Sequence, residues 1–226
     1  NVAENSGGAH CLKYGFTVNH VRGLDIVTPS GEQVRLGGKS PGAHGYDLIG
    51  AFVGSEGTLG VATRVTVALT RSPEKIVTLL FAFASMDAGG QAVGALLSAG
   101  VLPSAIEMMD ALAVEAAEEA VACGYPEGAA AVLIVELDGP SSEVDAQVAE
   151  VTRLCSEAGS FASRAADDAE DRARIWKGRK SAFAAVGRIS PAYIVQDGVV
   201  PRTALPEVLR RITELSAASG VRVANV

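Results

Sequence analysis

From residue 73 onward, short apolar runs alternate with longer amphipathic segments, and this alternation restricts the chain to few architectures. Short runs rich in β-branched residues are typical of buried strands, whereas apolar residues repeated every three to four positions are typical of helices. The expected strands are 76–84, 102–108, 130–137, 192–199 and 221–226, and the expected helices are 86–98, 110–122, 141–158, 168–186 and 203–220. We therefore predict an α+β domain of ferredoxin-like character, with helices on one face of an antiparallel sheet.

The first 72 residues differ from the rest, because short strands and turns predominate there. Strands are expected at 24–28, 34–36 and 61–69, with a loop rich in glycine and proline at 37–45 and a short helical turn at 46–52. The Ser72-Pro73 step follows the last of these strands and interrupts the chain. We place a domain boundary there, which gives units 1–72 and 73–226.

The composition excludes several classes of protein. The net charge is −7 and the basic residues are scattered, whereas a nucleic-acid-binding surface needs a basic patch or stripe. The longest apolar run, 76–84, is far shorter than the roughly 20 residues of a membrane-spanning helix. The three cysteines lie far apart without a CxxC motif, which favours a reducing, cytoplasmic location. The chain opens on Asn1 in loop-like sequence and closes on the strand-like run 221–226, so we expect an internal piece of a longer protein.

Two glycine-containing stretches have the character of a cofactor site. In AFVGSEGTLGVAT, Gly54, Gly57 and Gly60 leave a series of backbone N–H groups uncovered by side chains. The spacing matches neither the dinucleotide fingerprint GxGxxG nor a P-loop. In NVAENSGGAHCLKYG, short polar side chains precede a Gly-Gly bend, and such side chains can bind the edge of a heteroaromatic ring. The alternatives are a glycine-rich bulge at a strand edge and polar residues that only cap turns.

Arg179 is the most informative residue of the expected helix 168–186. It lies within an apolar stripe, whereas Lys177 and Lys180 point elsewhere; the stripe consists of Ile175, Trp176, Ala182, Phe183 and Val186. A guanidinium on an apolar face requires an anionic partner. The functional interpretation is a substrate carboxylate held by two parallel hydrogen bonds. The alternative is an internal acid, for which Glu107 is one candidate and Asp197 is another.

The histidines give no metal motif, since the spacings of His10, His20 and His44 match neither a helix face nor a zinc pattern.

Taken together and in this order, the motifs resemble a known family. They are NVAENSGGAHCLKYG, GYDL, VGSEGTLGVAT, SAIEMMD, IWKGR and YIVQDGVVPRTALPEVL. The chain is similar along its whole length to the FAD-linked oxidases of the vanillyl-alcohol oxidase superfamily, in particular to glycolate oxidase large subunits and D-lactate dehydrogenases. The resemblance implies that residues 1–72 are the later part of a two-part, PCMH-type FAD-binding domain. Residues 73–226 would then form most of a cap domain over the flavin.

The resemblance also implies roles for individual residues. Six would lie along the flavin end: Asn5, Ser6, Gly7, Gly8, Tyr14 and Gly15. Four would line the FAD chiefly through their backbone: Glu56, Gly57, Gly60 and Val61. Arg179 matches the cap arginine that grips the carboxylate of the substrate. The implied reaction is oxidation of a D-2-hydroxy acid by hydride transfer to flavin N5, with the proton taken by a histidine outside this chain.

Two family segments are missing from the sequence, and their absence shapes the remaining expectations. The pyrophosphate-binding loop would precede Asn1, and the His-Gly-Asp-Gly-Asn-Leu-His motif, with the catalytic and metal-binding histidines, would follow Val226. We therefore expect this piece to bind FAD poorly and to be inactive, and we assign it no catalytic or metal-binding residue. A divalent metal would belong to residues of the parent protein outside this chain.

The resemblance further implies partners and leaves two alternatives open. Additional oxidase subunits or an iron–sulfur protein are the expected partners, and they would hold an otherwise cytoplasmic protein at the membrane periphery. One alternative is a flavoenzyme of the same fold that acts on another alcohol, an aldehyde or an ether-lipid precursor. The other is a non-catalytic, cap-like subunit of a multi-subunit oxidase.

Overall fold

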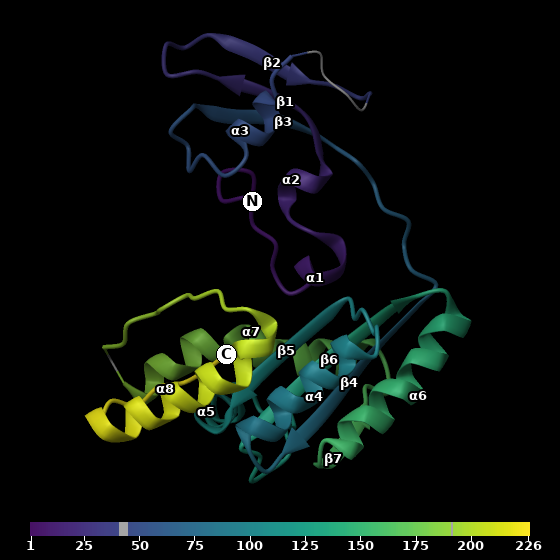
Figure 1. Cartoon of the computed structure of the whole chain (residues 1–226). Helices are drawn as coiled ribbons and strands as arrows, with labels where there is room; N and C mark the ends of the chain where they lie inside the picture. The colour runs from purple at the N-terminus through teal and green to yellow at the C-terminus, as the bar shows by residue number, and fades with distance from the viewer. Residues whose placement is uncertain (41–44, 191) are drawn as a thin grey trace. The chain divides into compact units, whose positions relative to one another are not determined.

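The computed structural model describes residues 1–40, 45–190 and 192–226, and it divides into two compact units, 1–72 and 73–226 (Figure 1). The division falls at the Ser72-Pro73 step. His44 and part of the loop expected at 37–45 lie outside the described residues.

Unit 1–72 is built on a three-stranded antiparallel sheet with the order β2-β1-β3. Its elements are α1 (Cys11–Tyr14), α2 (Thr17–His20), β1 (Val21–Val27), β2 (Gln33–Gly37), α3 (Leu48–Phe52) and β3 (Val61–Val67). The turn between β1 and β2 closes when Gly31, with φ of +84°, donates to the carbonyl of Thr28. A small core lies between β1 and α3; it comprises Val21, Leu24, Ile26, Phe52 and Val53.

Unit 73–226 contains a four-stranded sheet with the order β5-β6-β4-β7, in which all neighbouring strands are antiparallel. Its strands are β4 (Lys75–Phe83), β5 (Ala105–Asp110), β6 (Ala131–Gly139) and β7 (Ser160–Ala165). Its helices are α4 (Met86–Ser98), α5 (Ala111–Val121), α6 (Ser141–Glu157), α7 (Ala169–Ile189) and α8 (Leu205–Ser219), with a 3-10 turn at Arg202–Ala204. The β4-α4-β5 and β6-α6-β7 arms give the ferredoxin-like arrangement expected from the sequence.

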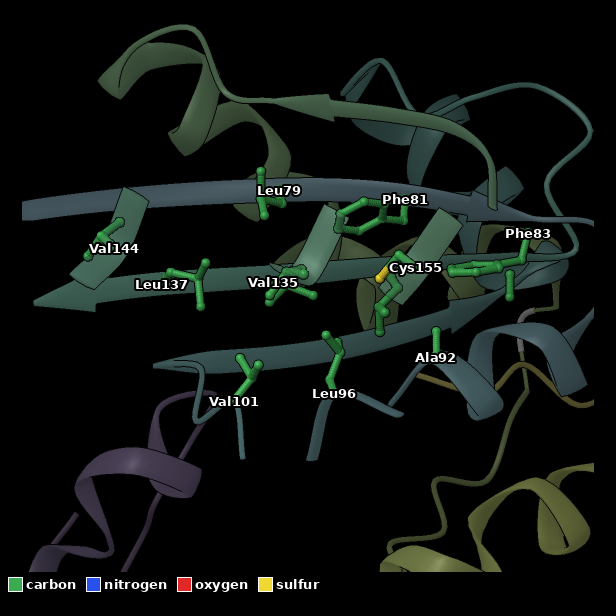
Figure 2. Packing of buried hydrophobic residues seen from close by; sticks show 13 residues of the cluster. Leu79, Phe81, Phe83, Ala92, Leu96, Val101, Val135, Leu137, Val144 and Cys155 are labelled. Atoms are coloured by element: carbon green, nitrogen blue, oxygen red, sulfur yellow. The ribbon is translucent and has the colours of Figure 1, made fainter. Parts of the chain in front are cut away.

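One face of this sheet packs against α4 and α6. Alternate residues of β4 and β6 point to that face, because successive side chains of a strand point to opposite sides. Figure 2 shows Leu79, Phe81 and Phe83 together with Val135 and Leu137 in this core. Ala92 and Leu96 come from α4, whereas Val144, Val151 and Cys155 come from α6. Phe81 and Phe83 are the largest fully buried side chains of this cluster.

The opposite face is also covered, so the expectation that all helices lie on one face is wrong for α5 and α7. Trp176 of α7 donates to the Glu136 carboxylate of β6 at 2.7 Å, and Glu136 lies between Val135 and Leu137 on the other side of the strand. β4 and β6 carry apolar residues at consecutive positions, such as Leu79 and Leu80. A strand that is apolar on both sides requires a covering layer on both sides.

Three further segments differ from the expected elements. Residues 160–165 form β7, although their small and polar side chains gave no strand signal. Residues 192–199 form no strand, and Ile194 and Val199 are exposed. Residues 221–226 form no strand either; Asn225 instead accepts from the backbone N–H of Asp110 at 3.0 Å. β-Branched composition favours a strand only where a sheet edge is within reach.

Candidate functional site

Helix α7 presents Arg179 from a largely buried face. Asp168 caps the start of the helix by accepting from the backbone N–H of Asp171 at 2.8 Å. Of the expected stripe, Ile175, Trp176 and Ala182 are buried, whereas Phe183 is exposed. Lys177 and Lys180 are exposed, as their place in the sequence predicted. The sequence therefore located the buried face of this helix at Ile175, Trp176 and Ala182, but was wrong for Phe183.

Glu107 of β5 is the partner of Arg179. The Nε of Arg179 donates to Oε2 of Glu107 at 2.8 Å, and each side chain keeps less than a fifth of its surface exposed. The guanidinium also lies 6.0 Å from the centre of the Phe183 ring. This is the internal pair that the sequence offered as the alternative to a substrate contact.

The pair leaves part of the guanidinium uncommitted. The hydrogen bond uses Nε, and the two terminal nitrogens of Arg179 make no further hydrogen bond to the residues that the structure describes. These nitrogens form the edge that binds a carboxylate through two parallel hydrogen bonds. Arg179 is therefore held from one side and can bind an anion from the other.

A polar network missed in the sequence lies beneath α7. Glu136 accepts from Thr78 Oγ1 and from Trp176 Nε1, both at 2.7 Å. Thr78 and Glu136 face each other across β4 and β6, so the sheet register brings them together. A buried carboxylate is tolerated only when hydrogen bonds compensate its desolvation. The network fixes the turn of α7 that carries Trp176, immediately before Arg179.

In unit 1–72, the structure brings the N-terminal segment and the glycine-rich stretch together. The backbone N–H of Gly54 donates to the carbonyl of Val2, and that of Glu56 donates to the carbonyl of Ala3, both at 2.9 Å. Asn5 accepts from the backbone N–H of Val18 at 2.9 Å. Two stretches that each gave a weak signal are thus joined by backbone hydrogen bonds.

The polar candidates of the N-terminal segment have internal contacts. The Ser6 hydroxyl donates to the side-chain oxygen of Asn1 at 3.3 Å. The Tyr14 carbonyl accepts from Nε2 of His20 at 2.8 Å. These bonds, with the one made by Asn5, are those expected of residues that only cap turns.

The candidate glycines fall into two groups when a side chain is imagined on each. A Cβ on Gly7 would contact Cys11 and Phe16, one on Gly15 would contact Asn19, and one on Gly60 would lie 2.4 Å from the carbonyl oxygen of Val27. These glycines are therefore explained by the fold itself.

Gly8 and Gly57 belong to the second group. Both have positive φ, and a Cβ there would meet only open space. Glu56 has φ of +52° and is exposed beside Gly57, and Val61 is exposed at the start of β3. The Ser55 hydroxyl oxygen nearby is buried without a hydrogen-bond partner among the described residues. Bare backbone and an unused polar atom fit a ligand that lies across this loop.

The described residues show neither a metal cluster nor a membrane-spanning helix. They contain no group of three or more His, Cys, Asp or Glu side chains that could hold a metal ion. No helix among them is both long enough and apolar enough to cross a membrane.

Comparison with known proteins gives a consistent result. The family model of FAD linked oxidases, C-terminal domain, matches residues 72–226. The chain is 47% identical over 226 residues to the glycolate oxidase subunit GlcD of Escherichia coli strain K12, covering 100% of this chain and 45% of that protein. It is 35% identical over 218 residues to GlcD of Bacillus subtilis strain 168, covering 96% of this chain and 46% of that protein.

A D-lactate dehydrogenase is a third relative. The protein from Anaerostipes hadrus is 30% identical over 231 residues, which cover 99% of this chain and 49% of that protein. The chain thus spans about half the length of the curated relatives that it matches.

Solved structures share the fold. An alkyldihydroxyacetonephosphate synthase aligns with a TM-score of 0.59 at 21% identity, over 81% of this chain and 37% of that chain. A p-cresol methylhydroxylase with bound substrate aligns with a TM-score of 0.54 at 18% identity. The alignment covers 69% of this chain and 37% of that chain.

Proposed function

Because the chain belongs to the family of FAD-linked oxidases, we propose that the whole protein is an FAD-dependent oxidoreductase that oxidises a D-2-hydroxy acid of the glycolate or D-lactate type. Relatives named glycolate oxidase subunit and D-lactate dehydrogenase support this substrate class. The structural observation that carries the proposal is Arg179, whose guanidinium is fixed through Nε and has two terminal nitrogens available for a carboxylate.

In this proposal, Arg179 binds and orients the substrate. Two parallel hydrogen bonds from the terminal nitrogens would fix both the position and the plane of the carboxylate. Glu107 restricts movement of the guanidinium, since its carboxylate accepts from Nε and leaves the two terminal nitrogens for the substrate. Orientation of this kind lowers the entropic cost of bringing the α-carbon into reacting position. No residue of this chain is assigned to proton removal.

FAD is the proposed cofactor of the whole protein, and the loop around Gly57 is its proposed contact in this chain. When bound, FAD would supply the acceptor of the electrons removed from the α-carbon. The open space beside Gly8 and Gly57 leaves room for such a ligand, and Glu56 and Val61 are exposed close to Gly57 in the sequence. The 226-residue piece alone is expected to hold FAD weakly, and any divalent metal would be bound outside it.

Further subunits are proposed as partners of the whole protein. The relative from Escherichia coli is itself named as a subunit of glycolate oxidase. Partner subunits, including one with an iron–sulfur cluster, would carry electrons onward and would hold the enzyme at a membrane surface.

A second candidate function is a flavoenzyme of the same fold with a different substrate. The observation that favours it is the ion pair between Arg179 and Glu107, because a guanidinium already neutralised within the protein has less need of a substrate carboxylate. The two candidates differ in what happens when Arg179 is removed.

The test begins with the visible spectrum of the full-length protein, before and after anaerobic addition of glycolate or D-lactate. We expect flavin bands that bleach. Persistent flavin bands would favour the second candidate, and the absence of flavin would contradict both.

The kinetic test is R179A in the same protein, with K180A as the matched control. Both variants remove one positive charge from α7. Lys180, however, is exposed, and it is Arg179 that pairs with Glu107. R179A should raise KM and lower kcat/KM for the hydroxy acid at least tenfold, which corresponds to losing about 1.4 kcal/mol of transition-state binding. K180A should leave kcat/KM unchanged. An R179A protein with full flavin content and unchanged kcat/KM would remove the substrate role.

The cofactor contact is tested with G57A and G60A. A methyl at Gly57 enters open space, so G57A should fold with a cost of about 1–2 kcal/mol for its left-handed backbone. It should also reduce the flavin-to-protein ratio after purification. G60A should instead destabilise the fold, because its Cβ would meet the Val27 carbonyl. A stable G57A protein with full FAD content would contradict the assignment.

A further inference from the structure

Tyr125 contacts the backbone of α7 one turn before Arg179, although the two lie far apart in the sequence. Its hydroxyl donates to the carbonyl of Ile175 at 2.7 Å, and the ring is buried. In an α-helix that same carbonyl accepts the backbone N–H of residue 179. The Tyr125 hydroxyl therefore lies on the helical turn that sets the direction of the Arg179 side chain.

Gly178 makes this contact possible. A Cβ at that position would lie 2.4 Å from the Tyr125 hydroxyl oxygen, 2.7 Å from its ring and 2.4 Å from the sulfur of Cys123. Gly178 is in the middle of α7, where glycine lowers helix stability by about 1 kcal/mol relative to alanine. Its φ is not positive, so backbone conformation does not require it. Glycine is required at this position because the Tyr125 side chain approaches the helix backbone so closely.

The loop that carries Tyr125 is itself held by α5. Oε1 of Glu118 accepts from the backbone N–H of Tyr125 at 2.7 Å and from the thiol of Cys123 at 2.9 Å. Ala122 adopts a left-handed conformation with φ of +46° to turn the chain at the end of the helix. A non-glycine residue in this conformation indicates a turn that the surroundings enforce.

The hydroxyl keeps its proton across the working range of pH. Burial is the largest influence and raises the pKa of Tyr125 well above its usual value, and the nearby Cys123 raises it further, while the backbone N–H of Arg179 lowers it. Burial also raises the pKa of Cys123 to about 12, with Glu118 adding to the effect. Both groups therefore act as neutral donors, and the contact does not depend on pH near neutrality.

We propose that Tyr125 and Gly178 are positioning residues that aim the Arg179 guanidinium at the substrate carboxylate, an inference that rests on the proposed function. Tyr125 fixes the backbone of the α7 turn before Arg179, and Gly178 leaves the space that the Tyr125 side chain occupies. Glu107 fixes Nε of the Arg179 side chain. An arginine held at both its backbone and its Nε presents its terminal nitrogens in one direction. Substrate orientation is sensitive to displacements of about 1 Å.

The experiment is a double-mutant cycle in the full-length flavoenzyme: wild type, Y125F, R179A and Y125F/R179A, each assayed for kcat and KM with glycolate and with D-lactate. Y125F removes only the hydroxyl and preserves the packed ring. It should raise KM and lower kcat/KM about tenfold in the wild-type background. In the R179A background, the same change should lower kcat/KM less than twofold, because there is no guanidinium left to aim.

The outcomes separate the inference from the proposed function. If R179A has no effect on kcat/KM, the proposed function of Arg179 fails and the positioning role fails with it. If R179A impairs the enzyme but Y125F equals the wild type, the inference alone is overturned. Equal losses from Y125F in both backgrounds would indicate a general structural effect and would also overturn it.

A second measurement distinguishes a local effect of Y125F on α7 from a general loss of folding. Hydrogen–deuterium exchange of the peptide spanning residues 172–183 would be compared in the wild type, Y125F and Y46F. Tyr46 is highly exposed in the other unit and provides the matched control. Y125F should raise exchange in this peptide selectively, whereas Y46F should not. Exchange that rises throughout unit 73–226, or not at all, would contradict the proposal.

Discussion

At the scale of single residues, the buried charges of unit 73–226 are each compensated by named partners. Glu136 accepts from Thr78 and Trp176, and Asp171 accepts from Arg164 and Arg174. A buried carboxylate without such donors would take up a proton or unfold the site. These networks hold both ends of the α7 segment that leads to Arg179.

Asp171 gives a pH dependence with a definite sign. Burial raises its pKa, but hydrogen bonds from Arg174 and Arg164 outweigh burial, so the pKa lies below the usual value of 3.8. A depressed pKa in the folded state gives stability that is present above the unfolded-state pKa of about 3.9 and is lost as the pH falls. The unfolding free energy of the wild type should therefore exceed that of D171N at pH 7, and the difference should shrink below about pH 4.

Urea unfolding between pH 7 and pH 3 measures this difference. D145N is the control, because Asp145 pairs with Lys75 at the exposed surface and such pairs contribute little. A D171N protein whose stability declines in parallel with that of the wild type across this range would show that Asp171 is not the group responsible.

At the scale of elements, helices α4, α5 and α7 of unit 73–226 begin at side-chain caps, whereas α6 and α8 begin without a side-chain cap hydrogen bond. Ser85, Asp110 and Asp168 each accept from a backbone N–H three residues on. Asp110 does more than cap α5, because its Oδ2 also accepts from the backbone and side-chain nitrogens of Asn225, at 2.7 and 2.8 Å. It thus ties residues 221–226 to the end of β5.

The two aspartate caps should differ in their contribution to stability. D168A should lower the unfolding free energy by about 1 kcal/mol, as expected for a lost cap. D110A should lower it by about 2 kcal/mol or more, since the bonds to Asn225 are lost as well. Chemical denaturation of both variants measures this, and N225A separates the tether from the cap. Equal losses in D110A and D168A would indicate that the tether adds no stability.

At the scale of the whole molecule, the two units have cores of different size. Unit 73–226 buries a large cluster between its sheet and two helices, whereas unit 1–72 buries five apolar side chains in its cluster. A small core leaves little margin over the entropy of folding. The segment 68–74, between β3 of unit 1–72 and β4 of unit 73–226, has no regular secondary structure.

Limited digestion with trypsin should therefore cut first after Arg71. Mass spectrometry is expected to show an early product beginning at Ser72 that persists, while the N-terminal product is degraded further. The isolated piece 73–226 should unfold in one cooperative transition, because it retains its complete core. Early cleavage after Arg164 of β7 or after Lys177 of α7, at a rate equal to cleavage after Arg71, would contradict this division of stability.

The sequence by itself determined the local elements, the ferredoxin-like class and the family. Hydrophobic periodicity, helix caps and terminating glycines are local signals. Helices α4, α5, α6 and α7 therefore lie close to the positions predicted from the sequence. The glycine-rich and N-terminal motifs carried the family resemblance, although each motif alone was weak.

The tertiary structure decided which distant residues meet. Glu107 was one candidate acid for Arg179. The pairing of β5 with β6 and the packing of α7 bring the two residues together, although they are 72 positions apart in the sequence. Tyr125 gave no sequence signal, because its value lies in a contact 50 positions away with the Ile175 carbonyl. β7 formed from small residues and 192–199 did not form a strand, since pairing depends on a neighbouring edge rather than on composition. A sequence pattern records whether a side chain is buried, whereas its partner depends on how the elements pack.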